Sequence, residues 1–406
     1  MQDQSPSTSS PLLVVVTNLK SPTSQDGHPI LTQKFVDGVH QYASHWPGPV
    51  RVLCQPTEGK DSNLDHHIYT PDSLTFEVCT VPFTKQNLRK HLSDASVVAS
   101  GFDYDKVSLA PLCEAINIPL VYITEYSTRT QLQIMRADRP NRLRRWRGYQ
   151  WVLSQRHPKN KALTKATAIQ CNGTPTWQEY MPLNKNRLLY FDTRVTEDML
   201  SSHETIRARR NDDAPLRLLF SGRLIPIKGA HQLPIFARHL RQMGIKFELK
   251  ICGDGESVPV IQKLIKQYQL SDCVELNGYL NFKTELLPLV KSWADLFVCT
   301  HLQGDPSCTY LETFSCGTPI LGYNNQAFQG LHDLTQIGWT AQINRPKKLA
   351  RICAEIANDR PMLYEHAHRA LDFAAENTFE KTFRKRIEHL HSLINSDPIP
   401  QKVSAN

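Results

Sequence analysis

The residues with the clearest chemical meaning lie in the segment Gln303–Pro319, QGDPSCTYLETFSCGTP. This segment follows a short apolar run, Asp295–Thr300, which is typical of a buried parallel strand. A turn of Asp, Pro and Ser residues then leads into a predicted helix over Tyr310–Cys316, and this helix carries the carboxylate of Glu312. Because the first N–H groups of a helix are unpaired and lie at the positive end of its dipole, the segment suits a phosphate or a sugar oxygen.

Two further motifs follow other strand-like runs in the second half of the chain. Ser221–Gly229 (SGRLIPIKG) holds Arg223 and Lys228 in a loop before a helix, where a guanidinium and an ammonium can neutralise a diphosphate. A solvent-facing loop is the alternative for these residues. Cys252–Glu256 (CGDGE) has two glycines that allow a close approach of backbone to a ligand, although an ordinary turn also fits. Ligands of open α/β sheets bind beyond the carboxyl ends of strands, so the three motifs together predict one site.

Strand-like runs alternate with helix-length segments along the chain, which predicts an α/β protein with two doubly wound, Rossmann-like domains facing a central cleft. We expect residues 12–196 and 216–375 to form these domains, with the polar segment 197–215 as a linker. Residues 1–11 are expected to be a disordered tail, and residues 376–406 a terminal helix and tail. The predicted strands are Leu12–Thr17, Val50–Cys54, Val97–Ser100, Pro119–Ile123, Ala168–Cys171, Leu216–Ser221, Phe247–Cys252, Val274–Leu276, Leu296–Thr300 and Ile320–Tyr323. The predicted helices are Ile30–His45, Val107–Ala115, a stretch within Arg136–Gln155, Gly229–Met243, Val258–Gln269, Phe282–Val290 and Lys347–Asn358.

Composition indicates an ordinary globular protein, with 40% hydrophobic and 21% charged residues among 406. The first residues lack the pattern of a signal peptide, and no run approaches the roughly 20 apolar residues that span a bilayer. The ten cysteines are scattered without a C-x-x-C pair, which favours reduced thiols in a cytoplasmic protein over a zinc site or disulfides.

The chain resembles the family 4 type of retaining glycosyltransferases, which have the two-domain GT-B fold. The resemblance is clear over roughly Leu216 to Ala374 and lies in the GRL…KG, CGDGE and Glu312 motifs. The amphipathic segment Glu376–Ile394 is similar in position to the family's last helix, which implies that it crosses back to the first domain. It implies that Arg223 and Lys228 neutralise a donor diphosphate and that Glu312 binds the donor ribose. The family's other motif Glu would fall at Gly304, so Asp305 is expected to contact the sugar instead. The remaining donor-binding residues implied are Gly222, Gly253, Asp254, Gly255, Ser307, Cys308 and Thr309.

The resemblance implies transfer of a hexose from a nucleotide diphosphate sugar to a hydroxyl of a glycan, lipid-linked or small-molecule acceptor, with retained configuration. The nucleotide sugar would be a co-substrate, and neither a cofactor nor a metal is expected, since the chain has no Asp-x-Asp. The alternatives are a GT-B protein that only binds nucleotide or polysaccharide, and a nucleotide-sugar epimerase or hydrolase. A NAD-dependent dehydrogenase is disfavoured because no G-x-G-x-x-G follows the first strand.

The first half of the chain is expected to bind the acceptor. Glu125 follows a predicted strand and is a candidate for contacting the acceptor or the donor sugar, while a helix-capping role is the alternative. Ten of the 47 Lys and Arg residues lie between Arg136 and Lys165, against one acidic residue. Basic residues mixed with aromatic ones suit the anionic inner face of a membrane; a solvated basic helix is the alternative, and nucleic acid is not expected as a partner. The residues that carry this hypothesis are Arg142, Arg144, Arg145, Trp146 and Arg147.

Overall fold

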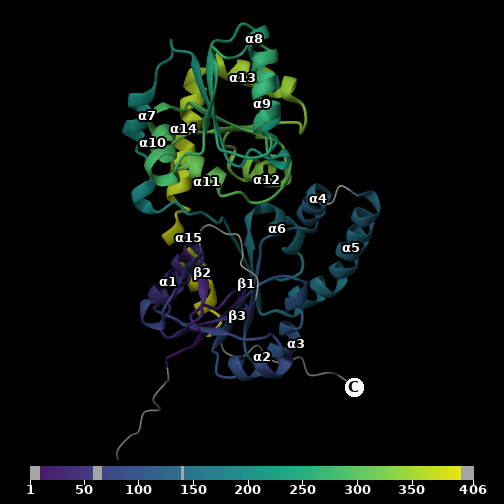
Figure 1. The fold of residues 1–406 in the computed structure, drawn as a ribbon. Helices are drawn as coiled ribbons and strands as arrows, with labels where there is room; N and C mark the ends of the chain where they lie inside the picture. The colour runs from purple at the N-terminus through teal and green to yellow at the C-terminus, as the bar shows by residue number, and fades with distance from the viewer. Residues whose placement is uncertain (1–9, 58–65, 139–140, 395–406) are drawn as a thin grey trace, which may run out of the picture.

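The structure is a computed structural model, and it describes residues 10–57, 66–138 and 141–394. The tail predicted for residues 1–11 lies almost wholly outside these ranges, as does the tail after the last helix. Figure 1 shows two domains stacked one above the other, with the first part of the chain in the lower domain. Within the described residues, no helix is long and apolar enough to cross a membrane.

The lower domain is built on a seven-stranded parallel sheet. Side chains of β1 alternate between its two faces: Val14 and Val16 belong to one apolar core, and Leu13 and Val15 to the other. A strand buried on both faces in this way is typical of a doubly wound domain. The strands, in their order across the sheet, are β5 (Glu77–Thr80), β3 (Val50–Pro56), β1 (Leu13–Ser21), β6 (Val97–Gly101), β7 (Leu120–Thr124), β8 (Ala168–Asn172) and β9 (Arg187–Tyr190).

Helices cover both faces of this sheet, and two short antiparallel strands, β2 (Ile30–Thr32) and β4 (His66–Ile68), lie beside it. The helix predicted from Ile30 begins only at residue 33, because residues 30–32 form β2. The basic region contains two helices that pack against each other rather than one. The helices of this domain are α1 (Gln33–His45), α2 (Lys85–Leu92), α3 (Leu109–Ala115), α4 (Thr128–Asp138), α5 (Arg142–Lys165) and α6 (Gly173–Tyr180).

The upper domain has a six-stranded parallel sheet around one large apolar core. Its strands, in order, are β12 (Val274–Gly278), β11 (Phe247–Cys252), β10 (Leu216–Ser221), β13 (Leu296–Cys299), β14 (Ile320–Tyr323) and β15 (Trp339–Ala341). Its helices are α8 (Leu233–Gln242), α9 (Val258–Gln267), α10 (Leu287–Trp293), α11 (Thr309–Phe314), α12 (Gln326–Thr335), α13 (Pro346–Ala357) and α14 (Arg360–Ala375).

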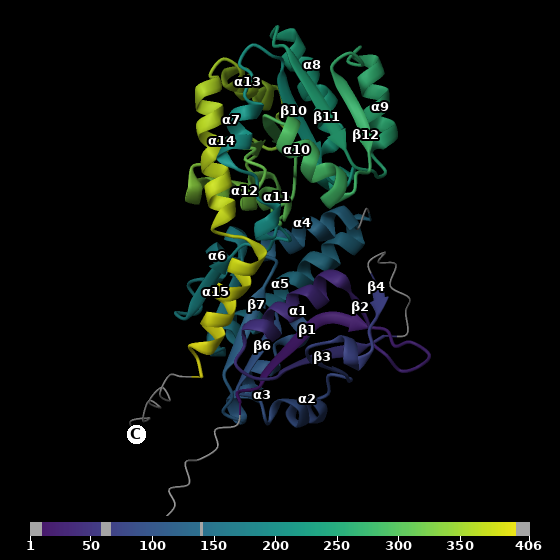
Figure 2. The same ribbon diagram turned by 90° about the vertical axis from the view of Figure 1, so that its left-hand side faces the viewer.

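The last helix, α15 (Phe379–His391), leaves the upper domain and packs on α1 of the lower one, as Figure 2 shows. Phe379, Phe383, Ile387 and Leu390 on α15 belong to the same apolar core as Leu13 and Val15 of β1. The last helix of the chain therefore contributes apolar side chains to the core of the lower domain.

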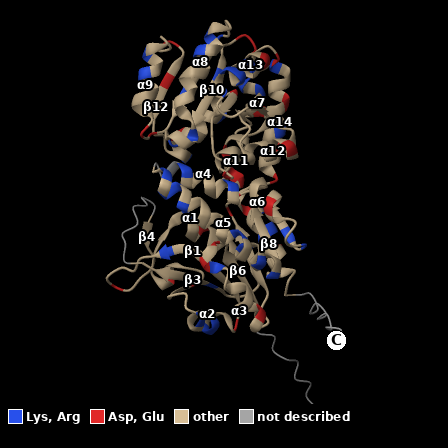
Figure 3. Cartoon of the chain, turned by 90° about the vertical axis from the view of Figure 1, so that its right-hand side faces the viewer, with Lys and Arg blue, Asp and Glu red and all other residues tan. Residues whose placement is uncertain are grey.

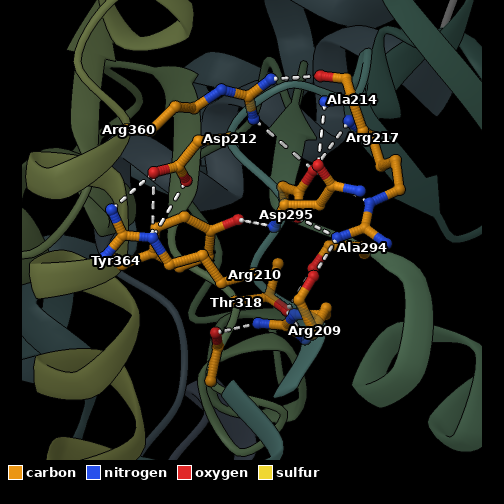
Figure 4. Close-up of polar contacts among 12 residues, drawn as sticks. Arg209, Arg210, Asp212, Ala214, Arg217, Ala294, Asp295, Thr318, Arg360 and Tyr364 are labelled. Atoms are coloured by element: carbon orange, nitrogen blue, oxygen red, sulfur yellow. Dashed lines mark hydrogen bonds and ion pairs between the residues drawn. The ribbon is translucent and has the colours of Figure 1, made fainter. Parts of the chain in front are cut away.

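The segment 197–215 is not the plain linker that its polarity suggested, because it contains α7 (His203–Arg209), which packs against α10 and α14. Ile206 is fully buried, and the buried guanidinium of Arg209 donates hydrogen bonds to backbone carbonyls, including that of Gly317 at 2.6 Å. Figure 4 shows Arg209 beside a second buried group, Asp295, which forms an ion pair with Arg217 at 2.7 Å. The hydrogen bonds of Arg209 thus hold the connecting segment against the upper domain.

Candidate active site

The loops after β10 and β11 touch through their backbones. A Cβ atom at Gly253 would lie 1.9 Å from the carbonyl oxygen of Gly222, so no larger residue fits there. Next to this contact, the N–H of Leu224 donates to the carbonyl of Asp254 at 2.8 Å, and the Asp254 carboxylate accepts from the N–H of Gly255 at 2.7 Å. The glycines of the predicted motifs therefore allow the two loops to touch. The carboxylate of Asp254 is used to stabilise its own turn.

Lys228 and Asp305, from the loops after β10 and β13, face each other. The Lys228 side chain is 9% exposed, and its Nζ lies 3.5 Å from Oδ2 of Asp305. The other carboxylate oxygen of Asp305 is buried and has no hydrogen-bond partner within the described residues. Arg223 is exposed, and its guanidinium makes no hydrogen bond or ion pair with any residue that the structure describes. The site therefore contains a buried cation, an unsatisfied carboxylate oxygen and an unengaged guanidinium.

Tyr126 of the lower domain lies near the same charges. Burial raises the pKa of its hydroxyl, and the charges of Asp305 and Arg223 act on it in opposite directions. Tyr126 follows β7 directly after Glu125, so the carboxyl edge of the first sheet lies close to the loops of the second.

Gly304 is held by the lower domain through its backbone. Its carbonyl accepts a hydrogen bond from Oγ1 of Thr130 at 3.0 Å, and its N–H donates to Oε1 of Gln133 at 2.9 Å. A Cβ atom at position 304 would lie 2.8 Å from Cβ of Gln326. A glutamate therefore does not fit at this position unless α4 and α12 shift, which gives a packing reason for the departure from the family's motif.

The segment Ser307–Thr309 leads into α11, which begins one residue before the predicted helix and ends two residues earlier. The N–H groups of Cys308 and Thr309 donate no hydrogen bond within the described part of the chain, whereas that of Ser307 donates to the carbonyl of Asp305. Burial raises the pKa of the Cys308 thiol to about 12, so this thiol is neutral.

Cys308 also touches two residues of the lower domain that the sequence did not single out. Its sulfur lies 3.8 Å from Nζ of Lys34 and 3.6 Å from Oδ2 of Asp192, and these two form an ion pair at 2.7 Å. Burial lowers the pKa of Lys34, but Asp192 and the other nearby acids outweigh it and raise the pKa overall. Both residues stand outside any recognisable motif, so only the fold brings them to the loop.

Glu312 is engaged by Arg194, a residue that sequence reasoning missed. Nε of Arg194 lies 2.7 Å from Oε1 of Glu312, and the guanidinium stacks 3.7 Å from the centroid of the Phe282 ring. No hydrogen bond is formed by Oε2 of Glu312 within the described residues. One oxygen of the carboxylate is thus fixed and the other is left for a ligand.

Glu125 lines a cavity of about 470 Å³ in the lower domain. Glu125 is exposed, but the protein atoms around it partly desolvate the carboxyl group and raise its pKa. The charge of Asp192 raises this pKa further, whereas Lys34 and Arg386 lower it. Glu125 makes no hydrogen bond or ion pair with the described residues, so it does not cap a helix there. The other polar side chains of the cavity include Asn18, Thr32, Lys34, Asp192 and Arg386.

The predicted basic residues lie in the first turns of α5. This helix carries eight Lys or Arg residues and no Asp or Glu. Trp146 is 59% exposed and Leu143 58%, while Arg142, Arg144 and Arg147 are exposed and Arg145 is half-buried. Figure 3 shows Lys and Arg gathered near α4, the helix that packs on α5. In the described ranges, no three His, Cys, Asp or Glu side chains are grouped as a metal site.

Solved structures with the same fold are glycosyltransferases. HepE of Anabaena in complex with UDP matches with a TM-score of 0.64 at 13% identity, over 94% of this chain and 99% of that one. A glycosyltransferase from Rickettsia africae matches with a TM-score of 0.64 at 13% identity, over 96% and 100%. The predicted fold is confirmed: the protein has the GT-B fold, with two Rossmann-like domains.

The family comparison agrees with this fold. Residues 202–375 match the model of the family described as glycosyl transferases group 1. The putative colanic acid biosynthesis glycosyltransferase WcaL of Salmonella typhimurium is 24% identical over 206 residues, which are 49% of this chain and 50% of that protein. The match thus spans half of this relative's length. Residues 202–375 are therefore similar to the group 1 glycosyl transferases, and the resemblance to glycosyltransferases stated from the motifs is confirmed.

Proposed function

We propose that this protein is a retaining glycosyltransferase that transfers a hexose from a nucleotide diphosphate sugar to a hydroxyl of a glycan or lipid-linked acceptor. The observation that carries the proposal is the ion pair of Lys228 and Asp305 beside the open N–H groups of Cys308 and Thr309. Arg223 lies near enough for its charge to act on Tyr126 together with that of Asp305. Support also comes from HepE, which was solved with UDP and with UDP-glucose, and from relatives named for colanic acid and amylovoran biosynthesis.

In this proposal, the cations stabilise the negative charge that grows on the leaving diphosphate. Lys228 is held in place by burial, and Arg223 has its donors available. The unsatisfied oxygen of Asp305 would accept a hydrogen bond from a sugar hydroxyl, and the free oxygen of Glu312 one from the ribose. The proposed reaction uses no metal, and the acceptor would enter from the lower domain, where Glu125 lines the cavity.

Calorimetric titration with UDP tests the donor site directly. We expect Arg223→Ala and Lys228→Ala each to weaken UDP binding about 10- to 100-fold, because a hydrogen bond to a charged group contributes about 1.5–3 kcal/mol. Lys263→Ala, at an exposed position on α9, is the control and should bind UDP like the unmodified protein. Unchanged affinity in both test variants would reject the diphosphate site; if no nucleoside diphosphate binds the unmodified protein, the proposed function itself fails.

We also propose that α5 docks the enzyme on an anionic membrane surface. The exposed Trp146 and Leu143 beside exposed arginines combine apolar area with positive charge, which suits the headgroup region of such a membrane. Sedimentation with lipid vesicles tests this part of the proposal, as described below.

A further inference from the structure

Arg386 of α15 is a buried cation without a direct ion-pair partner among the described residues, although the charges of Asp192 and Glu125 act on it from a longer distance. The residue is 7% exposed, and no carboxylate lies within ion-pair distance of its guanidinium in the described structure. Its Nε donates to Oε1 of Gln170 at 3.0 Å. Three aromatic rings surround the guanidinium, with centroids between 4.4 and 5.5 Å away: those of Tyr42, Tyr190 and Phe383.

These contacts leave the two terminal nitrogens of Arg386 unused. Neither Nη1 nor Nη2 forms a hydrogen bond with a described residue, and both atoms retain some solvent-accessible surface. Because Arg386 lines the cavity of about 470 Å³, its free edge faces this cavity. A buried charge costs free energy unless it is paired, and no carboxylate of the described residues contacts this guanidinium directly. The charges of Asp192 and Glu125 act on it only from a longer distance.

The surroundings of this cation fit a small polar ligand with one acidic group. Tyr42 is 4% exposed, lines the same cavity, and has a hydroxyl without a hydrogen-bond partner. Phe35 and Tyr190 contribute aromatic surface, and Glu125 offers an unpaired carboxyl to a hydroxyl group. The volume lies in the range of small-molecule sites, roughly 300–1,000 Å³.

Two residues of the cavity contact the loop before α11. Lys34 and Asp192 line the cavity, and both contact the sulfur of Cys308. A ligand that extends from Arg386 toward these residues would present its other end to the site of transfer.

We propose that this cavity binds the acceptor sugar through an anionic substituent, a carboxylate or a phosphate, and that Arg386 recognises it with its paired Nη donors. A planar guanidinium suits two-point recognition of either group. This inference rests on the proposed function, because it takes the cavity to be the acceptor site.

Titrations of the full chain with three probes, followed by ligand-observed NMR, test the inference. Methyl glucuronide and glucose 6-phosphate carry the acidic group, and methyl glucoside is the neutral counterpart. We expect at least one acidic probe to bind roughly tenfold more tightly than methyl glucoside, since one ion pair of about 1.4 kcal/mol corresponds to that ratio. The tighter of the two acidic probes identifies the substituent as carboxylate or phosphate.

Variants assign the preference to one residue. Arg386→Gln should bind acidic and neutral probes alike, and Arg386→Lys, which keeps the charge and the helix packing, should retain only part of the preference. Arg384→Gln, exposed on the same helix, should retain all of it. Equal binding of acidic and neutral probes to the unmodified protein, or an undiminished preference in Arg386→Lys and Arg386→Gln, would overturn the inference. The probes need no nucleotide, so a failure to bind UDP would count against the proposed function alone.

Discussion

At the scale of single residues, His301 is a buried base close to the cation of the candidate site. It follows β13, is fully buried, and neither ring nitrogen has a hydrogen-bond partner within the described residues. The rings of Phe220 and Tyr310 lie 6.2 Å from it, measured between centroids. Burial lowers its pKa well below 6.5, and the nearby charge of Lys228 lowers it further, so the folded protein holds a neutral imidazole.

This residue predicts how stability depends on pH. Above pH 6.5 the imidazole is neutral in both the folded and the unfolded protein. As the pH falls through 6.5, the imidazole binds a proton in the unfolded chain but stays neutral in the folded protein. The free energy of unfolding should therefore fall with decreasing pH, by at most about 1.4 kcal/mol per pH unit from this one group. Urea denaturation at pH 7.5 and 5.5 measures the loss, which should be smaller in His301→Gln.

His45→Gln, at an exposed position of α1, is the matched control, and it should lose as much stability as the unmodified protein. An identical loss in His301→Gln would show that other groups cause the dependence.

The sequence indicated where the motif residues lie, but not which residues contact them. Arg223, Lys228, Asp305 and Glu312 stand in motifs with a recognisable spacing that were expected to meet at the carboxyl edge of one sheet, and their binding of a donor stays a prediction. Arg194, Lys34 and Asp192 carry no local signal, because their role depends on contacts between segments far apart in the chain. Arg386 lies in a terminal helix whose amphipathic pattern indicated packing and not a charge inside a cavity.

At the scale of elements, the attachment of α7 and α14 to the upper sheet depends on Asp295. This carboxylate is 1% exposed, accepts two hydrogen bonds from the Arg217 side chain, and lies 3.6 Å from Nη1 of Arg360. Figure 4 shows the three residues together with a second pair, Arg210 and Asp212, which is far more exposed. The two pairs therefore offer a direct comparison of a buried and an exposed carboxylate.

We expect Asp295→Ala to lower the free energy of unfolding by about 3–5 kcal/mol, since removal of one partner leaves two buried cations uncompensated. Asp212→Ala should leave the melting temperature nearly unchanged, because exposed ion pairs contribute little. Thermal and urea denaturation followed by circular dichroism measure both variants. A similarly small effect at the two positions would mean that Asp295 is not a determinant of stability.

All ten strands predicted from the sequence are present, because buried parallel strands are continuous apolar runs that are easily recognised. The strands that were missed, such as β5, β9 and β15, lie at sheet edges or are short, and their patterns are correspondingly weaker. The helix α7 was missed because most of its residues are polar, and its buried arginine is satisfied by carbonyl groups that are distant in sequence.

At the scale of the whole molecule, the distribution of charge predicts how the protein meets a membrane. The basic helix α5 belongs to the lower domain, and the exposed arginines lie in its first turns. We expect the protein to sediment with vesicles that contain anionic lipid and not with neutral ones, and the binding to weaken with salt. Changing Arg142, Arg144 and Arg147 to Glu should abolish sedimentation.

Changing Lys263, Lys266 and Lys283 of the upper domain to Glu alters the net charge equally and serves as the control. This second variant should still bind the vesicles. Equal loss in both variants would indicate a general effect of net charge, and no binding of the unmodified protein at low salt would leave α5 without a membrane role.

Because α15 returns to the lower domain, the design of hybrids between this protein and its relatives must take account of the last helix. A hybrid that joined the first 200 residues to another protein's second half would inherit a foreign last helix, and with it different residues in place of Phe379, Phe383 and Arg386. Acceptor choice in such hybrids would follow the origin of residues 379–394 as well as that of the first half. Exchange of the donor domain alone therefore requires two crossover points, one before β10 and one between α14 and α15.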